Sequence, residues 1–221
     1  TTTYDTSIFG GGSSDATDSG DDSLVILGAL SAASVYGASG ADTLYVSGTS
    51  ASSSAAMFGG AGDDSFNVNQ ISGGSIFGGA SSGDTAAGND TITFSGDVTG
   101  LSVYAGSTTT YFTSDGATEL KTSTITGSAE ADSLAFLGSV TSSKILMGAG
   151  KDTINFEGEV VDGSTIAGSA GTSEVSYFEF GTGAVNATSL RGGSGNDSFT
   201  FGTNFSNSAS TGLAYFYDGG A

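Results

Sequence analysis

Residues 59–68 read GGAGDDSFNV, and this stretch decides the fold of the 221-residue chain. A glycine-rich corner comes first, an aspartate and a hydroxyl residue follow, and apolar side chains then alternate with others. An alternation of period two predicts a β-strand with one buried face. Because the same order of residue types recurs along the chain, an internal repeat determines the architecture.

The repeat is located by its aspartate, which returns after 20, 22, 26, 42, 20 and 45 residues. The aspartates in this place are Asp22, Asp42, Asp64, Asp90, Asp132, Asp152 and Asp197. The two long intervals are close to double steps. We expect Ser173 in the aspartate place of one missing copy, and the other copy, between Gly100 and Lys121, has lost the motif. A period of roughly 20–25 residues is typical of solenoid coils.

A second marker has the same period, because an aliphatic residue precedes each corner by about two positions. These residues are Ile8, Val35, Met57, Ile76, Val103, Ile125, Leu146, Ile166 and Leu190. Two short alternating segments per repeat predict two strands per coil, with residues such as Leu44 and Phe66 stacked on each other. The many Gly, Ser and Thr residues disfavour helix.

These patterns predict an all-β fold, a right-handed parallel β-solenoid of about nine coils of roughly 20–25 residues. We expect a single domain over residues 1–221 and interpret it as a segment of a longer repeat protein. Stacked coils lie about 4.8 Å apart, so the repeated aspartates should form one row along an edge of the rod.

The composition excludes several classes of function. The chain has 4 Lys and Arg against 23 Asp and Glu, a formal net charge of −19, and no His or Cys. Imidazole-based triads, zinc sites built on His and thiolate nucleophiles are therefore excluded. The charge argues against a nucleic-acid partner, and no apolar run approaches the ~20 residues of a membrane span. Nothing places carboxylate pairs such as Glu157 and Glu159 in a cleft, so we expect no enzyme.

The row of aspartates indicates a cation. At an effective dielectric constant near 20, carboxylates ~5 Å apart repel by ~3–4 kcal/mol, and Ca²⁺ accepts both carboxylate and backbone carbonyl oxygens. The alternative is that each aspartate caps its own turn through a local hydrogen bond. Asparagine would make that cap without repulsion, yet none of the seven copies uses it. The candidate metal ligands are Asp22, Asp42, Asp64, Asp90, Asp132, Asp152 and Asp197.

The motif resembles the RTX nonapeptide, Gly-Gly-any-Gly-any-Asp-any-apolar-any, of calcium-binding β-rolls. Its full form occurs at residues 59–66 and 192–199. The resemblance implies Ca²⁺ bound between aspartates and glycine-turn carbonyls of successive coils. Only one turn per coil carries the motif here, whereas a family β-roll has it at both turns. The chain therefore looks more like bacterial surface-layer or extracellular-matrix proteins of this kind than like the toxins.

An aromatic residue follows the aliphatic marker in several copies and should face outward. The column is Phe9, Tyr36, Phe58, Phe77 and Tyr104, and it fades into Thr126, Met147, Ala167 and Arg191. Such a column stabilises a sheet by stacking along one face. The alternative is a docking face for a neighbouring protomer or a surface glycan.

We therefore expect a non-catalytic extracellular structural protein at the cell surface, a calcium-stapled segment of a bacterial surface layer, sheath or matrix fibre. Its partners would be copies of itself or further repeats of the same chain, because uncapped solenoid ends leave sheet edges that pair. The alternative is an adhesin or phage-fibre module that binds glycan. A third interpretation is a β-helix enzyme acting on polysaccharide.

Overall fold

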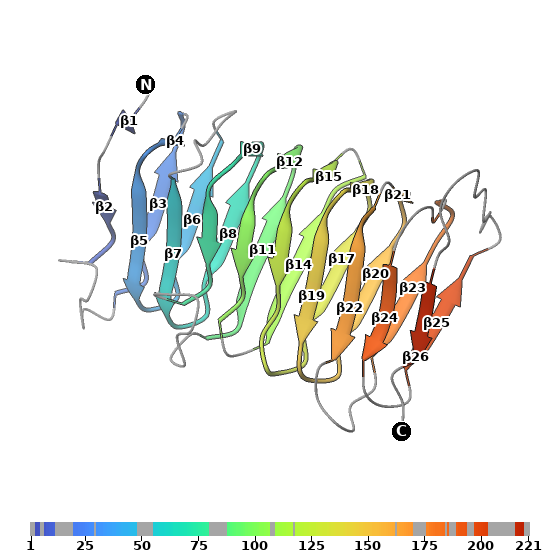
Figure 1. Cartoon of the computed structure of the whole chain (residues 1–221). Helices are drawn as coiled ribbons and strands as arrows, with labels where there is room; N and C mark the ends of the chain where they lie inside the picture. The colour runs from blue at the N-terminus through green and yellow to red at the C-terminus, as the bar shows by residue number, and fades with distance from the viewer. Residues whose placement is uncertain are drawn as a thin grey trace.

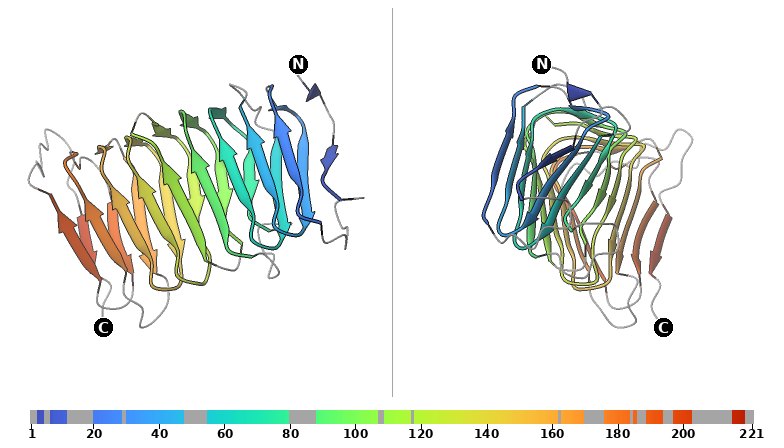
Figure 2. Two further views of the ribbon diagram at one scale, coloured as in Figure 1. Left: turned by 180° about the vertical axis from the view of Figure 1, so that it is seen from behind. Right: turned by 90° about the vertical axis from the view of Figure 1, so that its left-hand side faces the viewer.

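Successive repeats of the chain pair as parallel strands and build a solenoid with no helix among the described residues (Figure 1). The computed structural model describes residues 3–4, 7–11, 20–28, 30–47, 55–79, 88–106, 109–116, 118–161, 163–169, 176–183, 185, 189–193, 197–202 and 215–218. Within this part of the chain the solenoid makes about seven turns, slightly fewer than the nine expected. The view along the rod shows the coils wrapped around a common interior (Figure 2).

The alternating residues that follow each aspartate form a nine-stranded parallel sheet. Its strands are β3 (Ser23–Ile26), β6 (Thr43–Val46), β8 (Ser65–Val68), β11 (Asp90–Phe94), β14 (Thr110–Ser114), β17 (Ser133–Phe136), β20 (Thr153–Phe156), β23 (Tyr177–Phe180) and β25 (Ser198–Phe201). Leu44 pairs with Phe66, and Phe66 pairs with Ile92, which confirms the predicted stacking of equivalent residues.

The segments before the corners form a ten-stranded parallel sheet. Its strands are β2 (Ser7–Phe9), β5 (Ser34–Ser39), β7 (Ala56–Ala61), β10 (Ser75–Phe77), β13 (Ser102–Tyr104), β16 (Thr124–Thr126), β19 (Lys144–Gly148), β22 (Thr165–Ser169), β24 (Ser189–Gly193) and β26 (Tyr215–Asp218). The predicted marker is wrong by one residue in β19, where Ile145 pairs with Ile125 and Ile166. Leu146 faces outward, because Met147 takes the inward position that glycine holds in most coils.

The expectation of two strands per coil was incomplete, because five coils add a short third strand. These strands are β9 (Ile71–Ser72), β12 (Val98–Thr99), β15 (Leu120–Lys121), β18 (Val140–Thr141) and β21 (Val160–Val161), and β1 (Thr3–Tyr4) pairs separately with β4 (Leu30–Ser31). The first residue of each of the five strands is buried. The interior is thus enclosed by three sheets instead of two.

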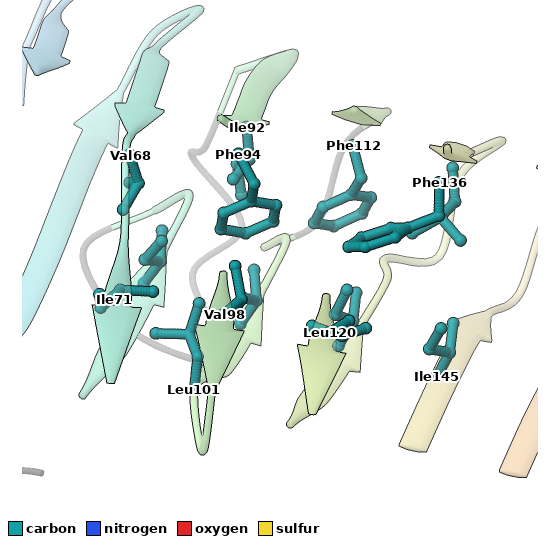
Figure 3. Close-up of a cluster of buried hydrophobic side chains, with 14 of the residues drawn as sticks. Val68, Ile71, Ile92, Phe94, Val98, Leu101, Phe112, Leu120, Phe136 and Ile145 are labelled. Atoms are coloured by element: carbon teal, nitrogen blue, oxygen red, sulfur yellow. The ribbon is translucent and has the colours of Figure 1, made fainter. Parts of the chain in front are cut away.

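Apolar side chains from the three sheets fill the interior in continuous rows. Figure 3 shows one row with Phe94, Phe112 and Phe136, which faces a row that includes Val98 and Leu120. All five side chains are at most 1% exposed. Burial of a side chain of this size contributes roughly 1.5–3 kcal/mol, so the rows are the main source of stability of the rod.

Glycine is required where coils approach closely. Gly40 and Gly62 have φ values of 131° and 127°, which residues with a side chain rarely adopt. A Cβ at Gly62 would overlap the carbonyl group of Gly40 one coil earlier. The glycines of the corner therefore set the close spacing that lets the aspartates of successive coils lie side by side.

Candidate functional site

The seven predicted aspartates lie in one column at the corner between the ten-stranded and nine-stranded sheets, which we call the aspartate column. Strand register places them there. Strands β3, β6 and β8 begin one residue after their aspartate, β11 begins at Asp90, and equivalent residues of these strands pair with one another. Two coils break the column. Thr110 pairs with Asp90 and takes the place of one missing aspartate. Ser176 takes the other, and Ser173, expected there, lies outside the described residues.

The side chains of the aspartate column point into the solenoid. Those of Asp42, Asp64, Asp90, Asp132 and Asp152 are at most 2% exposed, whereas Asp22 and Asp197, toward the two ends, are half-buried. The predicted row is therefore present, but it is internal and not spread along a solvated edge. A buried carboxylate must be paired, hydrogen-bonded or protonated, because burial removes its hydration.

In the six aspartates after Asp22, one carboxylate oxygen accepts a hydrogen bond from the coil before it. The N–H of Asp42 donates to Oδ1 of Asp64 at 2.9 Å, and the N–H of Asp64 donates to Oδ1 of Asp90 at 3.0 Å. The same bond joins Asp22 to Asp42 at 2.8 Å, Asp132 to Asp152 at 3.1 Å, Thr110 to Asp132 at 2.7 Å and Ser176 to Asp197 at 2.9 Å. The predicted cap within a single turn is thus replaced, in most copies, by a cap across coils.

The second carboxylate oxygen lies against a column of glycines that the sequence analysis did not connect with the aspartates. A Cβ on Gly37, Gly59 or Gly78 would overlap Oδ2 of Asp42, Asp64 or Asp90 respectively. Those three Oδ2 atoms are buried and accept no hydrogen bond from any described residue. Gly127 and Gly192 stand in the same relation to Asp132 and Asp197. The missing side chain of glycine provides the room for the carboxylate.

A main-chain carbonyl oxygen of the following coil also lies beside Gly37, Gly59 and Gly78. The position that a Cβ of Gly37 would take is also next to the carbonyl oxygen of Gly59 in the following coil. In the next coils the carbonyls of Gly78 and Ala105 stand in that place beside Asp64 and Asp90. A carboxylate oxygen and a carbonyl oxygen thus border the same space; the carbonyl of Gly78 accepts the N–H of Gly60 at 3.0 Å, whereas Oδ2 of Asp64 accepts no hydrogen bond from a described residue. Two acceptors so placed repel unless a proton or a cation lies between them.

Burial raises the pKa values of the column. The pKa of Asp64 rises to about 8 and that of Asp90 to about 7, chiefly because burial penalises the charged form. Backbone hydrogen bonds lower these values in part, and neighbouring aspartates raise them. The pKa of Asp42 is raised for the same main reason. Near neutral pH, and without a cation, part of the column therefore carries protons.

Asp132 shows what full hydrogen bonding does to the same carboxylate. The N–H of Ser128 donates to its Oδ2 at 2.6 Å, and the Ser128 hydroxyl lies 3.0 Å from that atom. Burial still raises the pKa of Asp132, but only to about 6, because these bonds and the one from Thr110 stabilise the charged form. Ser128 is a hydrogen-bond partner of the aspartate column that the repeat alone did not identify.

A buried serine column serves as an internal comparison at the corner between the five-stranded and ten-stranded sheets. The N–H groups of Leu101, Ser123 and Ser143 donate to the hydroxyl oxygens of Ser123, Ser143 and Ser164 at 3.1, 3.2 and 3.3 Å. This is the same cap from one coil to the next, made without charge. Capping therefore does not explain why seven copies of the other corner carry aspartate.

The aromatic column is a stack of rings. Ring centroids of Phe9, Tyr36, Phe58, Phe77 and Tyr104 lie 5.0, 4.7, 4.7 and 5.1 Å apart in order, with planes within 12° of parallel. Beyond Tyr104 the column continues as Thr126, Leu146, Ala167 and Arg191. The expectation of Met147 in this column was wrong, since Met147 is buried.

No three Asp, Glu, His or Cys side chains gather at one point within the described ranges. A metal at the aspartate column would therefore need main-chain oxygens in addition to carboxylates. None of the described segments is a helix that could cross a membrane. Comparison with protein-family models, curated proteins and solved structures found no match to the chain.

Proposed function

We propose that the chain is a non-catalytic structural rod whose successive coils are joined by Ca²⁺ at the aspartate column. The observation that carries the proposal is the buried Oδ2 of Asp42, Asp64 and Asp90, each facing a main-chain carbonyl of the next coil. Calcium takes six to eight oxygen ligands of these two kinds. The serine column supports the proposal, because it makes the same cap without a carboxylate.

The column divides into segments that would hold different numbers of ions. Neighbouring coils both supply a carboxylate at Asp22 with Asp42, Asp42 with Asp64, Asp64 with Asp90, and Asp132 with Asp152. Thr110 and Ser176 interrupt the series. We therefore expect up to four calcium ions in this rod, three toward the N-terminus and one further along. When bound, the ion would neutralise the carboxylates and tie adjacent coils together.

The setting that suits this rod is extracellular, as a repeat segment of a bacterial surface layer, sheath or matrix fibre. The resemblance of the motif to RTX repeats supports that setting, and the net charge of −19 suits a medium rich in calcium. An acidic rod repels its copies unless cations screen or bridge them. Self-association or continuation into further repeats would then supply the partner.

Calcium content after exhaustive dialysis, measured by elemental analysis and calorimetric titration, tests the proposal. Asp64→Asn keeps an oxygen that can cap Asp42 but removes the charge, so it should abolish two of the four sites. Asp97→Asn is the matched control, because exposed Asp97 also caps an amide, that of Glu119 at 3.0 Å, but at a different corner. A wild-type rod that retains no calcium, and whose thermal unfolding is unaffected by it, would falsify the proposal.

Assembly is tested separately by electron microscopy. We expect ordered filaments or sheets in calcium that disperse in chelator while circular dichroism still reports β-structure. A particle that stays monomeric in both conditions, with calcium bound, would keep the metal site and refute the structural role.

A further inference from the structure

We infer that the outer face of the ten-stranded sheet binds an extended, planar, cationic aromatic molecule along the aromatic strip. The strip is defined as the outward rings of Phe9, Tyr36, Phe58, Phe77 and Tyr104. This site is separate from the aspartate column and does not depend on calcium.

The first argument is the orientation of the rings. Each inner ring covers the faces of its neighbours at 4.7 to 5.1 Å, so the strip presents ring edges to the outside. Sugars bind aromatic residues over the ring face, and that face is used up inside the stack. The exposed ring edges form a continuous apolar surface, against which a flat aromatic molecule packs by dispersion and by removal of apolar area from water. The strip therefore suits a flat aromatic molecule that lies over several edges.

The second argument is the shape of the strip. Its ring centroids span about 19 Å along the rod axis, so it fits an elongated molecule aligned with that axis. A neighbouring outward column of small residues runs beside the rings, so no bulky side chain stands on that side of such a molecule. That column is Ser7, Ser34, Ala56, Ser75 and Ser102.

The third argument is charge. The four basic residues of the chain are Lys121, Lys144, Lys151 and Arg191, so none precedes residue 121. The strip ends at Tyr104 and lies in the part of the chain that is purely acidic. On the same sheet face, exposed Lys144 and Arg191 occupy the later coils. A cation is therefore attracted to the strip and repelled from the rest of that face.

The same charge argues against a second copy as the occupant. If two copies paired through their strips, the N-terminal half of each rod, which has acidic residues and no basic residue, would lie against that of the other. Like charges facing each other disfavour association. The strip is also narrow, with ten outward residues in its two columns, against the 20–30 residues per side of a stable interface.

Thioflavin T, an elongated planar cationic dye, is the probe, and Congo red, elongated and planar but anionic, is the charge control. We expect the soluble rod to bind thioflavin T at a saturable site with enhanced fluorescence and to bind Congo red about tenfold more weakly or not at all. Sedimentation velocity on the same samples excludes aggregates as the source of the signal.

Two kinds of variant test the site without endangering the fold. Phe58→Thr with Phe77→Thr removes two central rings, and Thr126 holds that column position naturally. Ser75→Lys adds a positive charge beside the rings, and Lys144 holds that column position in a later coil. We expect the first to weaken thioflavin T binding about tenfold or more, and the second to weaken it several-fold at low salt and less at high salt.

Tyr177→Ser is the matched control, because Tyr177 is 54% exposed on the nine-stranded sheet, away from the strip. It should leave dye binding unchanged. Equal binding by the folded Phe58→Thr/Phe77→Thr variant would overturn the inference, and so would equal affinity for the two dyes. A dimer in wild-type protein that the same variant dissociates would also overturn it, because the strip would then be an interface between copies.

Discussion

Asp64 accepts a hydrogen bond from the main chain of Asp42, 22 residues earlier, at 2.9 Å, and this contact connects one coil of the solenoid to the next. The same carboxylate places its second oxygen against Gly59, with no donor for that atom among the described residues. A polar group that is half satisfied in a buried corner is costly. Because such a carboxylate recurs in successive coils, a cation or a proton beside its second oxygen would offset a repeated cost.

Gly59→Ala should destabilise the rod, because the new methyl group would overlap Oδ2 of Asp64 and the carbonyl of Gly78. We expect a loss of about 2 kcal/mol or more, as for other overpacked interiors. Urea unfolding measures the loss. Gly116→Ala is the control, because nothing lies within 4 Å of the added Cβ, and it should change stability by no more than about 0.5 kcal/mol. Equal effects of the two substitutions would contradict the packing described here.

The Asp64→Asn substitution should stabilise the rod without calcium and destabilise it, relative to wild type, with calcium. The amide keeps an oxygen for the N–H of Asp42, and its NH₂ group can donate toward the carbonyl of Gly78. In chelator at pH 8.5 we expect a gain of about 1–2 kcal/mol, because an unsatisfied buried charge is removed. In saturating calcium the wild type should be the more stable protein, since ligand binding adds to its stability. A variant that is less stable than wild type in chelator would refute this account.

The calcium-free rod should lose stability as pH rises. The pKa values of Asp64, Asp90 and Asp132 are raised to about 8, 7 and 6 in the folded chain, against 3.8 ordinarily. Between these limits the folded chain binds more protons than the unfolded chain, so the free energy of unfolding falls with pH. The contribution is complete below about pH 4, decreases as pH rises toward the folded pKa values, and is gone above about pH 8.

Urea midpoints in chelator at pH 5 and pH 8.5 measure this dependence, and we expect the higher midpoint at pH 5. The Asp64→Asn/Asp90→Asn variant should show a flatter dependence, because two of the titrating groups are gone. A wild-type midpoint that increases with pH is the usual behaviour of salt-bridged carboxylates, and it would contradict the raised pKa values.

Ser143→Ala tests the uncharged corner. The substitution leaves the N–H of Ser123 without its acceptor at 3.2 Å and removes the bond from the Ser143 hydroxyl to the carbonyl of Thr141 at 2.9 Å. We expect a loss of about 1–3 kcal/mol that calcium does not restore. Ser95→Ala, at an exposed position, is the control and should be nearly neutral. A Ser143→Ala loss that calcium repairs would show that the two corners are not independent.

Much of the fold was predictable because it follows from periodicity. Spacing along the chain identified most strands of the two large sheets, although not β14 or β23, and it predicted the stacking of Leu44 on Phe66, which the structure confirms. The third sheet was missed, although a buried apolar residue such as Val98, Val140 or Val160 stands eight positions after the aspartate. Strands of two residues are too short to show an alternation, so only the recurrence of that single position could have indicated them.

The candidate site was predictable in its members and not in its geometry. A repeated position must form a column in any stacked solenoid, so sequence alone identified Asp22 to Asp197 as neighbours along the axis. Which way a corner side chain points is not a property of the repeat. The turn of the main chain between two sheets directs Asp64 inward, and a glycine five residues earlier makes room for it.

Sequence by itself determined the period, the parallel stacking and the in-step placement of like residues, because these depend on local alternation and on the need of each coil to bury one face against the next. Tertiary structure alone decided that the aspartates are internal, that those after Asp22 cap the coil before them, and that the outward rings lie face to face. Those features depend on distances between atoms some twenty residues apart, which only the wound chain brings together.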